Sequence, residues 1–367
     1  MASSSSPNIL LTGATGYIGG TILSHLLNSP FTALRAATIT CLLRGPDRAT
    51  RLISAYGSRV NPIVYKDLDD TEATVAAAAQ HDIVINTTDG WHAASSQALL
   101  RGLAQRKAST GRDVWFIQTS GTSNIGDRPI TKTWVEQEGR EFDDAKDDIY
   151  GYEKEREQKE REQKGCPYPQ RTTELAVVDT GLELGVKTLV IMSPTIFGFG
   201  TGLWNKLSVQ IPLLASAALQ NKRAVVVGDG KGTWDHVHIE DLAELYVLVV
   251  GRILEKGGKD VPTGKKGIIF SGNGRHLWLE VTQGLADVIH EKGLIADRQV
   301  QSIGISDTIK IMGSKIPTED MVELGFVSNS RTVSNVARGL GWKPTRGEEA
   351  WRREFRDVVE YMLAKGA

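Results

Sequence analysis

Cysteine is scarce in this sequence, with only Cys41 and Cys166 among 367 residues. Two cysteines are too few for a disulfide framework or a cysteine-based metal cluster. Because Cys41 lies in an apolar run, we expect its thiol to be part of the core. The scarcity of cysteine therefore excludes the small disulfide-rich proteins and the zinc-cluster proteins as classes for this chain.

The sequence also lacks an excess of charge and any long apolar run. A formal net charge of −1 gives no electrostatic reason to expect a nucleic acid or an anionic membrane as partner. No run approaches the roughly 18 apolar residues that cross a bilayer, and the opening Met-Ala-Ser-Ser-Ser-Ser-Pro lacks the basic and apolar parts of a secretory signal. We expect a soluble cytoplasmic protein with a small-molecule substrate, and the sequence also admits a homodimer.

What the sequence does contain is a regular alternation of β-branched runs and helical stretches. The runs are almost continuously apolar, as strands covered on both faces are. This alternation predicts the α/β class, with a Rossmann-type, doubly wound parallel sheet. The expected strands are residues 8–12, 38–43, 62–65, 82–86, 114–118, 187–192 and 267–271, and the expected helices include 17–27, 71–80, 93–106 and 172–184.

The pattern also predicts two parts of unequal size. We expect a dinucleotide-binding Rossmann domain over residues 1–195, with a charged helical insertion at 136–166. Residues 196–367 would form a smaller, mostly C-terminal substrate-binding part, of which 225–275 return to the Rossmann sheet. The insertion carries the tandem copy Glu-Arg-Glu-Gln-Lys at 155–159 and 160–164. A strong helix former with almost no apolar stripe predicts a solvated helix, as a lid or an interface arm.

A strand, a glycine-rich turn and a helix follow one another between Asn8 and Leu27. Gly13 permits a tight turn, Gly16 lets backbone N–H groups approach a diphosphate, and Gly19 lets the helix pack closely on the strand. The diphosphate would rest on the positive end of that helix. The sequence therefore predicts a nicotinamide dinucleotide held by Gly13, Thr15, Gly16, Tyr17, Ile18 and Gly19.

The end of the second expected strand distinguishes NADP from NAD. NAD-binding proteins usually place an acidic residue there, which binds the ribose 2′-hydroxyl. Here the strand ends on Arg44, with Arg48 shortly after it, and arginine pairs well with a 2′-phosphate. Asp47 would reach the ribose only in a tighter turn. We therefore predict NADP as the cofactor, with NAD as the less favoured choice.

Further motifs follow in the order of a known family. They are Thr12–Gly19, Lys66–Leu68, Asp82–Thr88, Phe116–Thr122, Ser193–Gly198, the stretch from Gly228 to Ala243, and Leu340–Pro344. Together they resemble the extended and atypical short-chain dehydrogenases/reductases, in the epimerase/dehydratase-like branch, and NmrA-like relatives also fit. The resemblance implies further cofactor contacts from Asp67, Leu68, Thr87, Thr88, Thr119, Pro194 and Thr195.

The family's chemistry uses a serine or threonine, and a tyrosine four residues before a lysine whose charge lowers the tyrosine pKa. Tyr150 with Lys154 is the literal match. The single helix that joins the family's tyrosine to its next strand favours Tyr168 instead, because Tyr168 precedes Ser193 by 25 positions and Tyr150 precedes it by 43. We predict Tyr168 as the catalytic tyrosine, and Tyr150 with Lys154 as the alternative.

Both partners of Tyr168 depart from the family pattern. Thr172 stands where the lysine would be, and Gly121 stands at the usual hydroxyl position, counted back from Gly126. Thr122 and Ser123, one and two positions later, could supply the hydroxyl in a shifted turn, and we predict Thr122. Without a lysine, the tyrosine pKa should stay at its ordinary value of about 10. A neutral phenol donates a proton well and accepts one poorly, which favours a reductase, or a site that binds cofactor without fast turnover.

Other side chains are candidates for substrate contacts. His92 is a candidate proton donor and Trp91 a stacking surface, although both fit the start of a helix equally well. Phe197 and Trp204 follow the sixth expected strand and are predicted to line the substrate site. We expect no metal: Asp235, His236 and His238 resemble a ligand set only superficially, and His238 fits a helix cap.

These observations predict an NADP(H)-dependent oxidoreductase. It would reduce a carbonyl or conjugated enone of a small hydrophobic or aromatic substrate by hydride transfer, with a tyrosine as proton donor. One alternative is an NAD-dependent nucleotide-sugar epimerase or dehydratase. The other is a non-catalytic NADP(H)-binding redox sensor that signals through a protein partner.

Overall fold

The apolar runs of the sequence form one central sheet of seven parallel strands, in the order β11-β7-β5-β4-β1-β2-β3. The computed structural model describes residues 8–312, 316 and 318–366. The sheet strands are β1 (Ile9–Thr12), β2 (Ile39–Arg44), β3 (Val60–Tyr65), β4 (Ile83–Asn86), β5 (Trp115–Gly121), β7 (Lys187–Ser193) and β11 (Ile268–Phe270).

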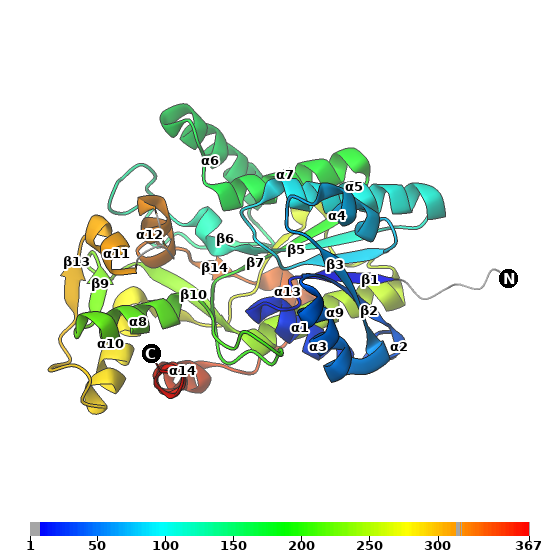
Figure 1. Cartoon of the computed structure of the whole chain (residues 1–367). Helices are drawn as coiled ribbons and strands as arrows, with labels where there is room; N and C mark the ends of the chain where they lie inside the picture. Colours follow the sequence, from blue (N-terminus) through cyan, green and yellow to red (C-terminus); the bar gives the residue numbers. More distant parts are fainter. Residues whose placement is uncertain (1–7, 313–315, 317, 367) are drawn as a thin grey trace.

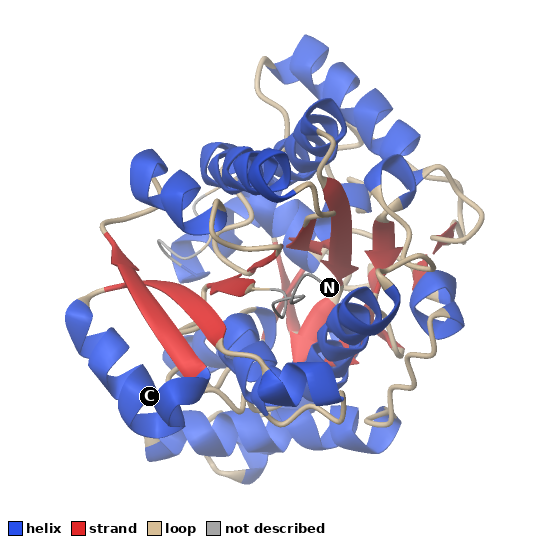
Figure 2. Ribbon diagram, turned by 90° about the vertical axis from the view of Figure 1, so that its right-hand side faces the viewer, coloured by secondary structure: helices blue, strands red, loops and turns tan. Residues whose placement is uncertain are grey.

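Helices cover both faces of this sheet (Figures 1 and 2). One face carries α4 (Thr71–Ala78), α5 (Ala93–Thr110) and α7 (Pro169–Leu184), and the other carries α1 (Tyr17–Leu27), α2 (Thr32–Ala36), α3 (Pro46–Tyr56) and α9 (Ile239–Lys256). The predicted Rossmann-type, doubly wound α/β fold is therefore confirmed. Cys41 is fully buried in the core, as its apolar surroundings predicted.

All seven expected strands are present, with small differences at their ends. The largest is at β5, which continues three residues beyond the predicted Gln118. Thr119, Ser120 and Gly121 stay paired with β7 although their side chains are polar or absent. Apolar character marks only the covered part of a strand, so the polar end that faces the carboxyl edge of the sheet was not recognised.

A smaller part lies beyond the carboxyl edge of the sheet and has its own apolar core. Its strands are β8 (Thr195–Phe197), β10 (Thr233–His238) and β12 (Arg275–Leu277) in one sheet, and the pair β9 (Val225–Val227) and β13 (Gln301–Ile303). Its helices are α8 (Gln210–Asn221), α10 (Trp278–Glu291), α11 (Ile305–Met312), α12 (Glu319–Phe326) and α14 (Glu348–Ala364).

Three short elements connect the two parts. The strands β6 (Phe142–Asp143) and β14 (Thr332–Val333) pair with each other, and α13 (Asn335–Gly339) follows β14. Within the described ranges, no helix has both the length and the apolar character that crossing a bilayer requires.

The charged segment forms the helix α6 (Ile149–Lys164), but the prediction of a solvated helix is wrong. Glu153, Arg156 and Glu160 are buried, and Glu160 forms ion pairs with Arg156, Arg171 and Arg128. The sequence does not show whether a charged residue is exposed or is buried in an ion pair with a residue distant in the chain. The pattern of α6 alone therefore could not show that its charges face the protein.

Candidate functional site

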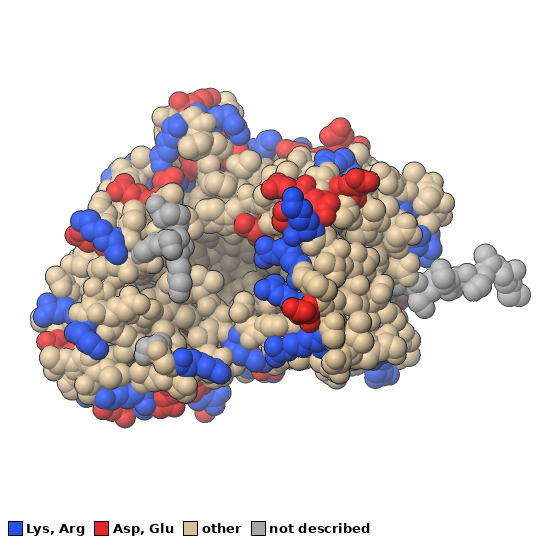
Figure 3. Space-filling model, viewed as in Figure 1, with Lys and Arg blue, Asp and Glu red and all other residues tan. Residues whose placement is uncertain are grey.

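A cavity of about 370 Å³ lies between the carboxyl edge of the central sheet and the smaller part. Figure 3 shows the face of the molecule hollowed at this place. The wall on the sheet side comes from the start of α1 and the residues that follow β4, β5 and β7. The opposite wall comes from α8, β10 and α12, including Gln210, Trp234, Met321 and Phe326.

The glycine turn lies directly behind one part of the cavity wall, which is formed by Tyr17, Ile18 and Thr87. Gly13 has a φ of +74°, and a Cβ placed on it would lie 2.5 Å from Thr87 Oγ1. A Cβ on Gly19 would lie 2.3 Å from both Gly13 O and Thr87 Oγ1. Thr87 is itself fixed, because its Oγ1 donates to Thr12 O at 2.7 Å. Only glycine therefore fits at these two positions of the turn.

The helix that follows the turn has an open N-terminus. Gly16 is the N-cap of α1, no described side chain caps the helix, and its first turn carries no acidic residue. Tyr17 and Ile18 of that turn line the cavity. Free backbone N–H groups at a helix N-terminus, in a turn without side-chain bulk, fit the diphosphate of a dinucleotide.

The predicted contacts for the adenosine end lie after β2 and β3. Arg44 ends β2 in register with Tyr65 of β3, and Arg48 lies in the first turn of α3. Both arginines are exposed, and neither has an ion-pair partner among the residues that the structure describes. After β3, Asp67 Oδ1 accepts a hydrogen bond from Asp69 N at 3.0 Å, and Leu68 follows Asp67 in the same turn.

The other predicted cofactor residues differ in how they meet the cavity. Thr88, Thr119 and Pro194 line it. Thr88 Oγ1 donates to Asn86 Oδ1 at 2.6 Å, and Thr119 Oγ1 lies 2.6 Å from the hydroxyl of Tyr246. Thr15 lies within the glycine turn, whereas Thr195 is fully buried and is not among the lining residues.

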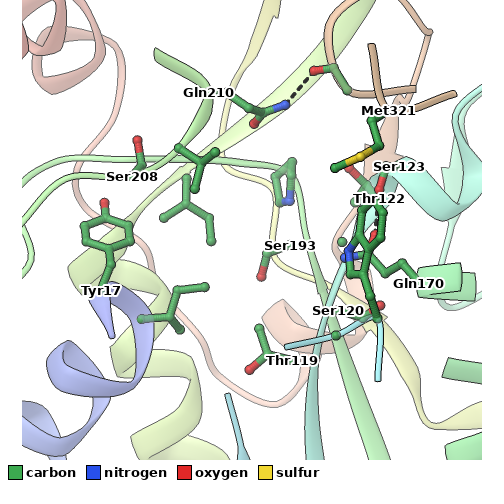
Figure 4. Close-up of a pocket in the computed structure, with 18 of the residues that line it drawn as sticks. Tyr17, Thr119, Ser120, Thr122, Ser123, Gln170, Ser193, Ser208, Gln210 and Met321 are labelled. Atoms are coloured by element: carbon green, nitrogen blue, oxygen red, sulfur yellow. Dashed lines mark hydrogen bonds between the residues drawn. The ribbon is translucent and has the colours of Figure 1, made fainter. Parts of the chain in front are cut away.

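Tyr168 lies in the cavity wall immediately before α7. Its hydroxyl donates to Ser123 Oγ at 3.2 Å, and Ser123 Oγ donates to Gln170 Oε1 at 2.6 Å. The ring of Trp91 contacts the phenol edge-on, with ring centroids 5.4 Å apart. The structure thus joins Tyr168, Ser123 and Gln170 in one hydrogen-bonded row, of which Ser123 and Gln170 are labelled in Figure 4.

Burial dominates the ionisation of Tyr168. It raises the pKa of the phenol to about 12, and the Ser123 hydrogen bond and the nearby Arg171 and Arg128 only partly oppose it. Thr172, at the family's lysine position, faces α6 and donates to Glu157 Oε1 at 2.8 Å. The phenol therefore stays protonated at neutral pH.

Tyr150 and Lys154 lie on α6 and do not line the cavity. The Tyr150 hydroxyl donates to Asp179 Oδ1 at 2.5 Å, and Lys154 Nζ donates to Asp179 Oδ2 at 3.1 Å. Asp179 belongs to α7, on the side away from Ser123. Tyr150 and Lys154 therefore lie close together, but away from Thr122 and from the cavity.

Thr122 lies at the cavity wall, but its side chain turns inward. It is 0% exposed, and its Oγ1 has no hydrogen-bond partner among the described residues. Its neighbour Ser123 is the hydroxyl that meets Tyr168. The reason is the 3-10 turn at Thr122–Ile125, which directs successive side chains to different sides.

Of the predicted substrate contacts, only Trp91 lines the cavity. His92 caps α5, since its Nδ1 accepts from Ser95 N at 3.2 Å, and its Nε2 lies 3.2 Å from Asp69 Oδ1. Phe197 is fully buried in the smaller part's core. The ring of Trp204 lies under the guanidinium of Arg51, 5.3 Å from centroid to Cζ.

The cavity lining contains no aspartate, glutamate, lysine, arginine or histidine among the residues that the structure describes. Its polar groups are hydroxyls, amides and backbone groups. Its apolar groups include Ile196, Val209, Met321 and Phe326. Sequence reasoning named Ser123 only as the second choice after Thr122, and it missed Gln170 and the α12 residues. Gln170 stands two positions after Tyr168, which is the signal that could have found it, whereas α12 carries no recognisable motif.

Comparisons with known proteins agree with this geometry. Residues 146–261 match the model of the NAD dependent epimerase/dehydratase family. The Oxidase ucsJ of Acremonium sp. is 30% identical over 353 residues, which cover 92% of each chain. The solved dTDP-glucose 4,6-dehydratase DesIV of Streptomyces venezuelae, with NAD and TYD bound, superposes with a TM-score of 0.63 at 15% identity, covering 97% of both chains. The UDP-glucuronic acid 4-epimerase of Bacillus cereus, in complex with UDP-glucuronic acid and NAD, gives 0.60 at 14% identity, covering 97% of this chain and 99% of the other.

Proposed function

The chain belongs to the NAD dependent epimerase/dehydratase family of the extended short-chain dehydrogenases/reductases, and on that premise we propose that it is an NADP(H)-dependent reductase. Its substrate is a small, neutral, hydrophobic or aromatic molecule with a carbonyl or conjugated enone. The observation that carries this proposal is the cavity itself. A protonated tyrosine lies in its wall, and no described residue that lines it is charged.

The residues present fit a dinucleotide. The turn at Gly13–Gly19 and the uncapped start of α1 would hold the diphosphate. Arg44 and Arg48 have the charge and the exposure to bind a 2′-phosphate, which favours NADP for this chain, although the solved relatives named above hold NAD. When bound, the reduced nicotinamide supplies the hydride.

The protein's own part in the chemistry is the proton. In the reduction, the carbonyl carbon gains a hydride and its oxygen gains a proton. Tyr168 keeps its proton at neutral pH, because burial raises its pKa to about 12. Tyr168 lines the cavity itself, so its phenol lies beside the space that a substrate would occupy. A phenol of this pKa is a weak base, which disfavours the alcohol oxidation that begins an epimerisation or a dehydration.

The lining also bears on the substrate class. A nucleoside diphosphate buried in a cavity needs cations or several strong donors to offset the loss of its hydration. No lysine or arginine lines this cavity among the described residues. Apolar groups such as Val209, Met321 and Phe326 instead favour a neutral ring or chain. A nucleotide sugar is therefore the less favoured substrate.

The test is NADPH oxidation with a panel of aromatic ketones and enones. We expect Tyr168→Phe to lower turnover by about 10²- to 10⁴-fold while NADPH binding is retained, because only the proton donor is lost. Tyr150→Phe is the matched control and should leave turnover unchanged. Unchanged turnover in Tyr168→Phe would contradict the assignment. NADPH binding without turnover on any member of the panel would favour the redox sensor, and co-purified NAD would contradict the choice of cofactor.

A further inference from the structure

We propose that the side-chain amide of Gln170 binds the carbonyl oxygen of the substrate as a hydrogen-bond donor. This inference rests on the proposed function and names the group that selects a carbonyl compound. It assigns to an amide the place that a serine or threonine hydroxyl holds in the family's pattern.

The amide occupies space that two glycines leave open. A Cβ placed on Gly121 would lie 3.1 Å from Gln170 Oε1 and 3.2 Å from its Nε2. A Cβ on Gly90 would lie 3.6 Å from the same Nε2. Gly121 is the residue at the usual hydroxyl position, as counted from Gly126. The Gln170 amide therefore depends on glycine at position 121, because a larger side chain there would crowd it.

The orientation of the amide follows from its hydrogen bonds. Tyr168 donates its hydroxyl hydrogen to Ser123 Oγ at 3.2 Å, so the Ser123 hydrogen remains to donate to Gln170 at 2.6 Å. An atom that accepts this hydrogen must be Oε1 and not Nε2. The Gln170 NH₂ group is thereby fixed as a donor, and it donates to no other described residue.

Gln210 is the other glutamine amide of the lining, and it is already engaged. Its Nε2 donates to the carbonyl of Gly325 at 2.7 Å, which ties α8 to α12. Figure 4 shows this bond at one side of the cavity, and Gln170 beside Ser123 and Thr122 at another. One of the two Gln210 NH₂ hydrogens is therefore used within the protein, whereas the Gln170 NH₂ group donates to no described residue and keeps both of its hydrogens for a ligand.

An amide donor and a phenol donor do different chemistry. The NH₂ group of Gln170 does not give up a proton, but it stabilises negative charge that develops on a carbonyl oxygen. Tyr168, which lines the same cavity, supplies the proton. A molecule of the same shape that lacks an acceptor would bind more weakly, because it would displace water from the Gln170 NH₂ group and leave this donor unpaired.

The experiment measures binding rather than turnover. Acetophenone, ethylbenzene and 1-phenylethanol are titrated calorimetrically into the full-length protein in the presence of NADP⁺. We expect the wild type to prefer acetophenone over ethylbenzene by about tenfold, the value of one well-placed hydrogen bond. Gln170→Leu should abolish this preference. Gln170→Glu, which replaces the donor by an acceptor, should favour 1-phenylethanol over acetophenone.

Gln158→Leu, on the exposed side of α6, is the matched control and should keep the wild-type preference. An unchanged preference in Gln170→Leu, or a wild type that does not favour the ketone, overturns the inference. If Gln170→Leu fails to fold, the near-isosteric Gln170→Glu decides the question. A protein that shows the Gln170-dependent preference but never oxidises NADPH would contradict the proposed function and leave this inference standing.

Discussion

Arg44 is the last residue of β2, and its guanidinium is exposed beside the end of β3. A bound dinucleotide that rests on α1 would place its adenosine ribose near this strand end. An arginine gains charge-assisted hydrogen bonds from a 2′-phosphate that a 2′-hydroxyl does not offer. The choice between two cofactors of equal shape thus depends on single side chains.

Replacing Arg44 by alanine should therefore weaken NADPH binding by about 10- to 100-fold, the loss of one or two charge-assisted bonds, and leave NADH binding nearly unchanged. The measurement is calorimetric titration of both cofactors at fixed ionic strength. Arg35→Ala, at an exposed position of α2, is the control. Equal affinity of the wild type for NADPH and NADH would show that Arg44 does not select the cofactor.

Glu354 shows how burial of one carboxyl makes stability depend on pH. It accepts a hydrogen bond from Gly198 N at 2.9 Å, and burial raises its pKa from the ordinary 4.5 to about 7. The folded protein keeps this proton up to about pH 7, whereas the unfolded chain releases it near 4.5. Its contribution to stability is therefore complete below pH 4.5 and is lost as the pH rises through about 7.

We accordingly expect the free energy of unfolding to fall between about pH 5.5 and 8.5, and to fall less in Glu354→Gln, by up to about 2 kcal/mol. The amide keeps an acceptor for Gly198 N and does not titrate. Urea denaturation at the two pH values measures the difference. Glu348→Gln, at an exposed position of the same helix, should behave as the wild type does. An identical pH dependence in both variants would contradict the raised pKa.

How far single residues could be predicted depends on whether their role is local. Gly13 and Gly19 were predictable because a tight turn and a close helix approach are needs of the turn itself. Ser123 was ranked below Thr122, since the orientation of two adjacent hydroxyls depends on the 3-10 turn that follows β5. Gln170 was missed because its role arises from the space beside Gly121, which exists only in the folded chain.

At the scale of elements, strands were easier to predict than the role of a charged helix. The strands are recognisable because each apolar run is covered on both faces. The helix α6 is built instead around ion pairs. Glu160 binds Arg171 at 2.9 Å and also accepts from Tyr168 N at 3.1 Å, so α6 supports the start of α7 and the wall of the cavity. Neighbouring arginines lower the pKa of Glu160 to about 2.

The two copies of Glu-Arg-Glu-Gln-Lys in α6 allow a buried glutamate to be compared with an equivalent exposed one. Glu155 and Glu160 occupy the same place in the two copies, but their side chains are 59% and 6% exposed. Glu160→Ala should destabilise the protein by about 3–5 kcal/mol, because it leaves the buried Arg156 and Arg171 without their ion-pair partner. Glu155→Ala should change the free energy of unfolding by less than about 0.5 kcal/mol. Equal effects, measured by chemical denaturation, would mean that the copies are equivalent.

The whole molecule is tied together by a chain that crosses repeatedly between its two parts. After β7 the chain enters the smaller part, returns to the central sheet at β11, and leaves it again at β12. Side chains add to this link, since Arg128 pairs with Asp320 at 2.6 Å, and Glu323 accepts from the backbone of Ile130 and Thr131. Neither part can therefore unfold without disturbing the other.

Thermal unfolding should consequently occur in one transition, and NADPH should shift that transition as a whole. At a concentration of NADPH a hundred times its Kd, linkage adds about 2.7 kcal/mol to the free energy of unfolding. For a chain of this size that corresponds to a rise in Tm of roughly 3–4 °C. Differential scanning calorimetry with and without NADPH measures both quantities. The contrary outcome is two separate transitions, of which NADPH raises the Tm of only one. It would show that the glycine turn and the smaller part unfold independently, and would contradict a cavity whose walls depend on both.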